Sequence, residues 1–255
     1  MKSEHRNLTT SHNPKPALPP IAIRFQNVSK GYRASQVLRE IDLDIACGEF
    51  FGLVGMNGAG KTTLIKCLLD FCALDSGTIE IFEVSHSLTE SRKFLSFLPE
   101  RFMPPYYLTG MDFLKYMLKL QALPYNQSAS KEMLQALDLD QSALSRPVRL
   151  YSKGMIQKLG LAACFLADKN LYVLDEPMSG LDPKARSLLK SRLQQLRTTG
   201  RTLFFSSHSL TDVEEICDRM AILHEGRISF VGSPADCRRT FHANTIEQAY
   251  LNCIG

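Results

Sequence analysis

A glycine-rich stretch with one lysine and two threonines carries the strongest chemical signal in the sequence. It has the spacing G-x-x-x-x-G-K-[ST], with Gly55, Gly60, Lys61 and Thr62 in the fixed places. Glycines let a backbone curl so that successive N–H groups face a phosphate chain, and the partial positive charge of a helix N-terminus adds to that attraction. We therefore expect Lys61 to reach the β- and γ-phosphates of a nucleotide and the Thr62 hydroxyl to ligate Mg²⁺.

The sequence on either side of this stretch predicts a strand and a helix. Residues 50–54 are apolar apart from one glycine, which is typical of a buried parallel strand, and residues 62–71 carry apolar side chains at helical spacing. A glycine-rich turn that matches by accident is the alternative interpretation. The strand–loop–helix context argues against it, because a phosphate-binding loop needs that context.

Two adjacent carboxylates, Asp175 and Glu176, follow a second apolar strand that begins at residue 171. Ligands of an open parallel sheet bind beyond the carboxyl ends of its strands. We expect Asp175 to contact Mg²⁺ through water and Glu176 to accept the proton of an attacking water. Such a pair can also simply cap a strand, but the phosphate loop upstream favours the catalytic interpretation. His208, just past a predicted strand at 202–206, could contact the γ-phosphate, although a lone histidine is usually packed.

Two aromatic features are open to more than one interpretation. Tyr32 is either an ordinary turn tyrosine or a ring that stacks on a purine. Residues 101–107 hold three aromatic side chains and a methionine on a segment too rich in proline for a helix or a central strand. These side chains could pack inward or form a docking surface.

Alternating apolar and polar residues predict a small antiparallel sheet that covers one side of the phosphate-loop core. Its strands are expected at 21–25, 37–45 and 78–82, with turns at 27–31 and 76–77. A short strand is expected at 94–98.

Capping residues predict several helix starts. Thr109 is expected to cap a helix that runs to about residue 122, and a further helix is expected at 130–137. Together with the start of the helix that opens at 151–155, these helices predict a helical subdomain inserted at roughly 101–160. Asp182, followed by Pro183, is a good N-cap for a helix that Gly200 ends. Ser209 is expected to cap a short helix to Cys217, and Glu225-Gly226 to turn a hairpin of 219–223 with 227–231.

Composition narrows the class of protein. The chain has 255 residues, 44% hydrophobic, with a net charge of +4 and no dense Lys/Arg run, so we expect no nucleic-acid partner. Its seven cysteines form no C-x-x-C pair, and reduced thiols are the default expectation. The longest nearly apolar run, 159–167, is far shorter than the ~18–20 residues of a membrane span, so a membrane role would need a partner.

The order of these motifs, with Tyr-Ser-Lys-Gly-Met at 151–155 between the phosphate loop and the Asp-Glu strand, resembles that of ATP-binding-cassette (ABC) transporter ATPase subunits. The resemblance covers about residues 21–235 and is closest to the exporter-like, ABC-2-type branch. It implies an α/β P-loop NTPase fold: a RecA-like core with a parallel sheet, a small antiparallel β-subdomain and an inserted helical subdomain. The implied domains are a disordered tail at 1–20, the ATPase domain at 21–240 and a short C-terminal tail at 241–255.

The resemblance also implies roles for single residues. Tyr32 would stack on adenine, Asp182 would link the two nucleotide sites of a dimer, and His208 would be the switch histidine. Ser152 and Gly154 would contact ATP held by the opposite subunit, which agrees with the hydroxyl and free N–H groups at a helix start. The nucleotide-binding loop would consist of Gly55, Met56, Asn57, Gly58, Ala59, Gly60, Lys61, Thr62 and Thr63. Asp175 would bind the metal ion. Glu176, His208 and Lys61 would be the catalytic residues.

Two positions depart from the family pattern. Lys153 replaces a glycine of the usual Leu-Ser-Gly-Gly-Gln signature, and its side chain could add charge near phosphate or, as we expect, point to solvent. Glu100 stands where the family has a glutamine. A carboxylate ligates Mg²⁺ as an amide oxygen does, so we expect Glu100 to serve the metal.

The resemblance implies an ATPase that binds ATP and Mg²⁺, dimerises on ATP and drives a separate integral membrane permease. The second ATPase subunit would be another copy of the chain or a related chain, and the localisation would be the cytoplasmic side of the inner (cell) membrane. Export is favoured by the signature form, by Glu100 and by the short C-terminus. A soluble family member acting on a non-membrane partner, or a regulatory subunit with little hydrolysis, are the alternatives. Intact Lys61, Asp175, Glu176 and His208 argue against the second of these.

Overall fold

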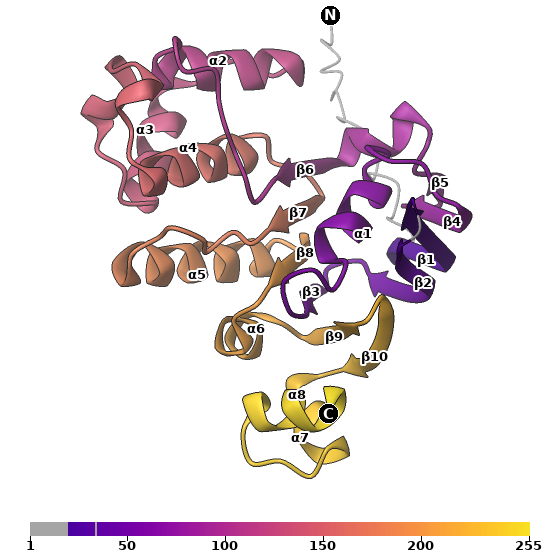
Figure 1. Cartoon of the computed structure of the whole chain (residues 1–255). Helices are drawn as coiled ribbons and strands as arrows, with labels where there is room; N and C mark the ends of the chain where they lie inside the picture. Colours follow the sequence, from indigo (N-terminus) through magenta and orange to yellow (C-terminus); the bar gives the residue numbers. More distant parts are fainter. Residues whose placement is uncertain (1–19, 34) are drawn as a thin grey trace, which may run out of the picture.

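A six-stranded sheet forms the centre of the computed structural model, which describes residues 20–33 and 35–255 (Figure 1). The predicted disordered tail at 1–20 therefore lies outside the described residues, apart from its last position. The strand order is β10-β9-β3-β8-β7-β6, and all neighbours are parallel except β9 and β10. The strands are β3 (Phe50–Val54), β6 (Leu95–Leu98), β7 (Leu171–Asp175), β8 (Thr202–Ser207), β9 (Arg219–His224) and β10 (Arg227–Gly232).

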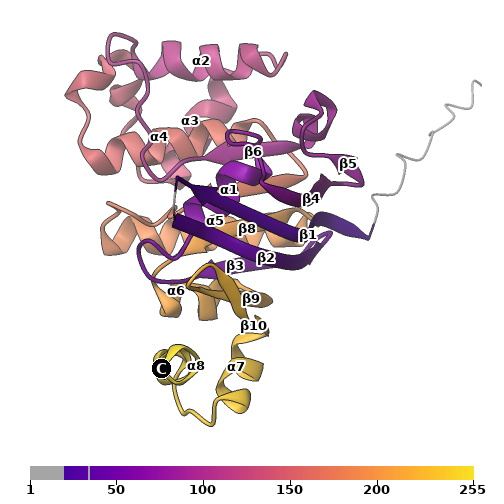
Figure 2. The same cartoon turned by 45° about the vertical axis from the view of Figure 1, so that its right-hand side comes forward.

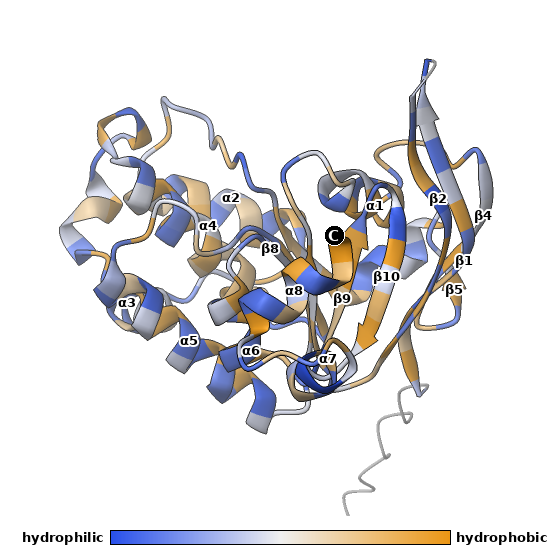
Figure 3. Ribbon diagram, turned by 60° about the horizontal axis from the view of Figure 1, so that its bottom comes forward, coloured by the Kyte–Doolittle hydropathy of each residue, from blue (hydrophilic) through white to orange (hydrophobic). Residues whose placement is uncertain are grey.

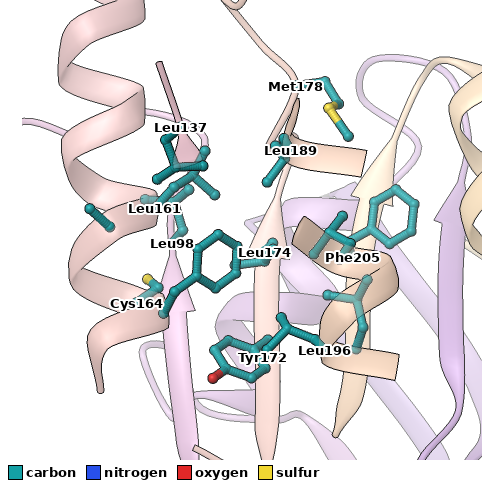
Figure 4. Packing of buried hydrophobic residues seen from close by; sticks show 14 of the residues in the cluster. Leu98, Leu137, Leu161, Cys164, Tyr172, Leu174, Met178, Leu189, Leu196 and Phe205 are labelled. Carbon is teal, nitrogen blue, oxygen red and sulfur yellow. The ribbon is translucent and has the colours of Figure 1, made fainter. Parts of the chain in front are cut away.

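The central strands are buried on both faces, which explains why their sequences are continuous apolar runs. Along β3, Phe50 and Val54 face one hydrophobic cluster, whereas Phe51 and Leu53 face the other. The same alternation occurs along β7 and β8. The first cluster joins the sheet to helices, with side chains such as Leu161, Cys164, Leu189 and Leu196 packed on Leu98, Tyr172, Leu174 and Phe205 (Figure 4).

A four-stranded antiparallel sheet, in the order β2-β1-β4-β5, packs over the second cluster and confirms the predicted antiparallel layer. Its strands are β1 (Ile21–Tyr32), β2 (Ser35–Ala46), β4 (Ser76–Ile81) and β5 (Val84–Ser85). Helix α1 (Lys61–Leu68) contributes Leu64, Ile65 and Leu68 to the same cluster. Figure 2 shows α1 between this sheet and the central one.

The predicted turn at 27–31 is wrong, because β1 continues through it as an irregular strand. The pairing with β2 shifts register between Phe25 and Val28, and Asn27 has φ of 50°. The N–H of Asn27 donates to Oδ1 of Asp42 at 2.8 Å, so a side chain replaces the missing ladder partner. The predicted turn at 76–77 is likewise part of β4, where Gly77 accommodates φ of 90°.

Helices on the other face of the central sheet begin at three of the predicted caps, whereas the helix predicted at 130–137 begins at Gln127, after a cap at Asn126. Thr109 forms a capping box with Asp112 at the start of α2. The side chains of Asp182 and Ser209 accept hydrogen bonds from backbone N–H groups in the first turns of α5 and α6. The helices are α2 (Gly110–Leu120), α3 (Gln127–Ala136), α4 (Lys153–Leu166), α5 (Pro183–Thr198) and α6 (Leu210–Ile216). Among the described residues no helix is long and apolar enough to cross a membrane; the longest, α5, has 16 residues.

Helices α2, α3 and α4 gather at one end of the molecule, away from the antiparallel sheet (Figures 1 and 2). Short 3₁₀ turns connect them: Gln141–Ser145 and Val148–Leu150, with another at Thr89–Phe94 before β6. The boundaries proposed for the helical subdomain, roughly 101–160, enclose α2, α3 and the first turns of α4.

Two C-terminal helices were not anticipated from the sequence. Helices α7 (Pro234–Thr240) and α8 (Ile246–Ile254) follow β10 and lie beside α6 and the last strands (Figure 3). Ile246 and Ala249 are buried in the cluster on the helical face of the sheet. The segment 241–255 is therefore a packed helix over most of its length.

Phe204 of β8 joins the two sheets, and its removal should destabilise the fold. Its ring centroid lies 6.3 Å from those of Phe25 and Phe51, and the side chain is fully buried. We expect Phe204→Ala to lower the free energy of unfolding by about 3–5 kcal/mol, measured by urea denaturation. Phe71→Ala, at a phenylalanine that is 65% exposed, is the matched control and should cost less than about 1 kcal/mol. Equal losses in the two variants would contradict this role of Phe204.

Candidate functional site

The glycine-rich loop connects β3 to α1 and has glycines at positions where another residue would be strained or would clash. Gly60, the N-cap of α1, has φ of 113°, and a Cβ on Gly55 would lie 2.5 Å from the carbonyl oxygen of Leu223. Helix α1 has no side-chain cap, whereas α2 to α8 all begin with one. The first N–H groups of α1 are thus free of side-chain acceptors and open to an anion.

Lys61 places its ammonium group inside this loop. Its Nζ donates to the carbonyl oxygen of Gly55 at 2.7 Å and to that of Met56 at 3.4 Å. The same Nζ lies 3.7 Å from Oε1 of Glu176, and the lysine is buried. A cation is therefore held where the loop curls, between backbone oxygens and a carboxylate.

A chain of hydrogen bonds joins the loop to the ends of two neighbouring strands. Thr62 Oγ1 donates to Oδ2 of Asp175 at 3.0 Å, and the hydroxyl of Ser206 donates to Oδ1 of the same carboxylate. The N–H of Glu176 in turn donates to Ser206 Oγ at 3.0 Å. The register explains the contact, because Asp175 on β7 pairs with Ser206 on β8.

Glu176 adopts a left-handed backbone conformation that is unusual for a glutamate, with φ of 49°. Its carboxylate reaches Lys61 on one side, and on the other its Oε2 lies 2.8 Å from Nδ1 of His208. Strained residues of this kind persist where the surrounding structure holds them, and they cluster at functional sites. Glu176 is therefore oriented by a cation and an imidazole.

These groups line a cavity of about 450 Å³ at the carboxyl ends of the parallel strands. The residues predicted from the sequence that line this cavity are Met56, Asn57, Gly58, Gly60, Lys61, Thr62, Thr63, Glu100, Glu176 and His208. Asp175 is buried behind Thr62, while Gly55 and Ala59 form the loop without lining the cavity. A depression of about 560 Å³ beside α7 has no carboxylate at a strand end, so we assign the site to the phosphate loop.

Tyr32 lies close to the cavity but is not part of its wall. The side chain ends β1 and is 46% exposed, with Nζ of Lys30 5.4 Å from the ring centroid. A hydrogen bond to the thiol of Cys72, together with burial, raises the pKa of Tyr32 to about 12, and a hydrogen bond to Thr63 opposes that rise. Stacking of this ring on a purine stays a prediction.

Ser152 and Gly154 lie at the start of α4 and do not line the cavity of their own chain. Ser152 caps the helix by accepting from the N–H of Met155 at 3.2 Å. The Lys153 side chain is exposed, as expected, but its stem lies along Gly180 and its Nζ donates to Ser179 Oγ at 3.4 Å. Lys153 thus contacts the segment that follows Glu176.

Sequence reasoning missed four residues of the site. Ser206 bridges Asp175 and Glu176, and Val37, Arg101 and Ser179 line the cavity. A hydroxyl at the end of an apolar strand was the available signal for Ser206, but strand order was needed to place it beside Asp175. Val37 belongs to the antiparallel sheet, and no local pattern links it to the loop.

The oxygen atoms beside the loop fit a hard divalent cation. Thr62 and Asp175 are hydrogen-bonded to each other, and Glu100 lines the same cavity. Within the described ranges no group of three or more His, Cys, Asp and Glu side chains could hold a metal by itself. A cation here would need ligands from a phosphate, which is how Mg²⁺ is commonly bound at nucleotide sites.

Comparison with known proteins gives consistent matches. Residues 38–179 match the family described as ABC transporter. An ABC transporter ATP-binding protein of Synechocystis sp. is 35% identical over 87% of this chain, and the Nod factor export ATP-binding protein I of Rhizobium etli is 33% identical over 84% of it. The chain spans 66% and 69% of these two proteins, and 59% of a Nostoc relative.

A solved structure is similar over nearly the whole of both chains. The ATP-binding subunit of an ABC transporter superposes with a TM-score of 0.83 and 29% sequence identity. The superposition covers 91% of this chain and 99% of that one. The fold of this chain has thus already been seen in such a subunit.

Ser206→Ala should destabilise the strand ends that build the site. The substitution removes a donor to Asp175 and leaves the buried N–H of Glu176 without its acceptor. We expect a loss of about 1–3 kcal/mol in the free energy of unfolding, measured by urea denaturation. Ser187→Ala, on the exposed face of α5, is the control and should change stability by less than about 0.5 kcal/mol. Unchanged stability in Ser206→Ala would show that this bridge contributes nothing.

Proposed function

The chain belongs to the ABC transporter family, and we propose that it is the ATP-binding and ATP-hydrolysing subunit of a transporter. The observation that carries this proposal is the hydrogen-bonded connection from Thr62 through Asp175 and Ser206 to Glu176. It joins a phosphate-binding loop to a carboxylate positioned to act on water. A site for binding alone would not need Glu176 held between Lys61 and His208.

In the proposed reaction, the loop N–H groups and Lys61 hold the phosphate chain and stabilise the charge on the transferred group. Glu176 accepts a proton from the attacking water, and its strained backbone keeps the carboxylate aimed into the cavity. His208 orients that carboxylate through its ring nitrogen. Ser206 fixes the backbone between the two carboxylates.

Mg²⁺ is the cation we assign to this site, with Thr62, Asp175 and Glu100 as the residues that would hold it. The ion, when bound, neutralises phosphate charge. Asp175 is already oriented by two hydroxyl donors, which leaves its position independent of the ion.

A second ATPase subunit completes the proposed site. Ser152 and Gly154 lie at a helix start and do not line their own chain's cavity, so we assign their donors to a nucleotide on another chain. The partner is a second copy of this chain or a related one. Asp182, two residues after Gly180, caps α5 beside this helix start and is our candidate for the link between the two sites.

A membrane permease on a separate chain is the proposed partner for coupling. Between β6 and α2 the chain exposes Met103, Tyr106 and Tyr107, with exposed fractions of 88%, 69% and 69%. Exposed apolar side chains gathered on one segment support a docking surface. We propose export as the direction, on the signature form and on the Rhizobium etli relative named for Nod factor export. The chain would then lie on the cytoplasmic side of the cell membrane, held there by the permease.

Glu176→Gln tests the proposed hydrolysis. The amide keeps the size of the side chain but cannot accept the proton of water, so ATP turnover should fall by about 100-fold or more while ATP binding persists. Phosphate release and binding of a fluorescent ATP analogue measure the two effects. Glu132→Gln, on the exposed face of α3, should retain normal turnover. Near-normal turnover in Glu176→Gln would remove Glu176 from the role of base.

Co-purification tests the proposed partner. The tagged Glu176→Gln chain, with ATP present, should recover a multi-span protein in stoichiometric amount from detergent-solubilised membranes of the native host. The same chain carrying alanine at Met103, Tyr106 and Tyr107 should recover less of it, because the docking side chains are gone. Recovery of soluble partners alone would favour a soluble ATPase that acts on a non-membrane partner.

A further inference from the structure

Two thiols lie against each other at the end of the helix that follows the phosphate loop. The Sγ atoms of Cys67 and Cys72 are 3.5 Å apart. Among the seven cysteines, all within the described residues, no other pair is in hydrogen-bond contact. The proposed reaction uses neither thiol.

The two thiols differ in access, as a reactive pair requires. Cys67 belongs to α1 and is fully buried, whereas Cys72 follows the helix and is partly exposed. Burial, with the contact to Cys72, raises the pKa of Cys67 to about 12, so Cys67 is a poor first nucleophile. Cys72 is the thiol that a small oxidant in solvent would meet.

The positively charged side chain of Lys30 lies near the two thiols. The Lys30 ammonium group forms an ion pair with Asp75 at 2.9 Å, and its charge opposes the rise in the pKa of Cys67. Cations near a thiol favour the thiolate, and Asp75 opposes that effect on Cys67. Lys30 also lies over the ring of Tyr32, 5.4 Å from its centroid.

The thiol pair is linked to the nucleotide site through Tyr32. Asp75, three residues after Cys72, accepts hydrogen bonds from the Lys30 ammonium group at 2.9 Å and from the N–H of Gly31 at 2.7 Å, directly before Tyr32 in β1. A change at Cys72 would therefore reach the ring predicted to stack on adenine. This link is the basis of a regulatory effect.

We propose that Cys67 and Cys72 are an oxidative modification site that reacts with a peroxide to form a disulfide. The thiolate of Cys72 attacks one peroxide oxygen, which breaks the O–O bond and leaves a sulfenic acid and a hydroxide ion. The hydroxide takes up the proton that the Cys72 thiol released on ionising and becomes water. The sulfur of Cys67 then displaces the hydroxyl group of the sulfenic acid, which leaves as a second water with the thiol proton. The two sulfurs are oxidised, and hydrogen peroxide is reduced to two waters.

Disulfide formation requires only local movement. The sulfurs must approach from 3.5 Å to about 2.05 Å. Helix α1 ends at Leu68, and Asp70 has φ of 59°, so Cys72 lies outside the helical hydrogen-bond ladder. The movement would draw the Cys72 sulfur toward the buried Cys67 and shift the segment whose Asp75 holds Lys30 and Gly31 beside Tyr32. The effect on nucleotide affinity rests on the proposed function, whereas the disulfide itself does not.

Peptide mapping of the full chain tests the chemistry. Trypsin cleaves after Lys66 and Arg92, so both cysteines fall in one peptide. After treatment with hydrogen peroxide under native conditions and alkylation, this peptide should be lighter by two hydrogen atoms and free of alkyl groups. Dithiothreitol should reverse the change. Cys72→Ser should abolish it, and Cys47→Ser, at another partly exposed cysteine, should leave it intact. Full alkylation of both thiols at doses that oxidise Cys47 would overturn the proposal.

Nucleotide affinity tests the consequence. Oxidation should raise the Kd of a fluorescent ATP analogue by about fivefold, the loss expected when a stacking platform is displaced. The rise should be absent in Cys72→Ser and Cys67→Ser and reversed by dithiothreitol. A disulfide that forms without changing the Kd would overturn the regulatory role. Failure of the reduced chain to bind the analogue at all would instead count against the proposed function.

Discussion

The site depends on three parallel strands that end at the same level of the sheet. Asp175 on β7 pairs with Ser206 on β8, and Val54 on β3 pairs with Ser207. This register brings Thr62, Asp175, Ser206 and Glu176 within hydrogen-bond reach. A slip of one residue would turn every side chain of a strand to the opposite face, so the apolar residues on both faces fix the chemistry at the strand ends. The same strand register therefore determines both the packing of the core and the geometry of the site.

Local patterns predicted much of the fold and of the site. The phosphate loop, the Asp-Glu pair and the caps at Thr109, Asp182 and Ser209 depend on neighbours within a few residues, and the structure has the predicted strands and helices around them. Ser206 could not be predicted, because its partner lies 31 residues away on an adjacent strand. The irregular course of β1 at Asn27 was hidden for the same reason, since Asp42 supplies its hydrogen bond. The contact of Lys153 with Gly180 likewise depends on how α4 packs, and the roles assigned to single site residues stay predictions.

The contrast between capped and uncapped helices explains where an anion can bind. The helices from α2 to α8 satisfy an N–H of their first turn with a Ser, Thr, Asn or Asp side chain. The N-cap of helix α1 is Gly60, which has no side chain that could accept a hydrogen bond. Each side-chain cap is worth about 1 kcal/mol, so α1 forgoes stability that the other helices gain. An anion at that position would satisfy the donors that the sequence leaves open.

The lysine inside the loop has a consequence for product release. The ammonium group of Lys61 donates hydrogen bonds to two carbonyl oxygens and lies near the carboxylate of Glu176, so its charge is not buried without partners. These oxygen atoms would compete with a product phosphate for the ammonium group of Lys61. Under the proposed hydrolysis, the cavity would therefore empty toward a stable resting state, which favours turnover over tight retention of products.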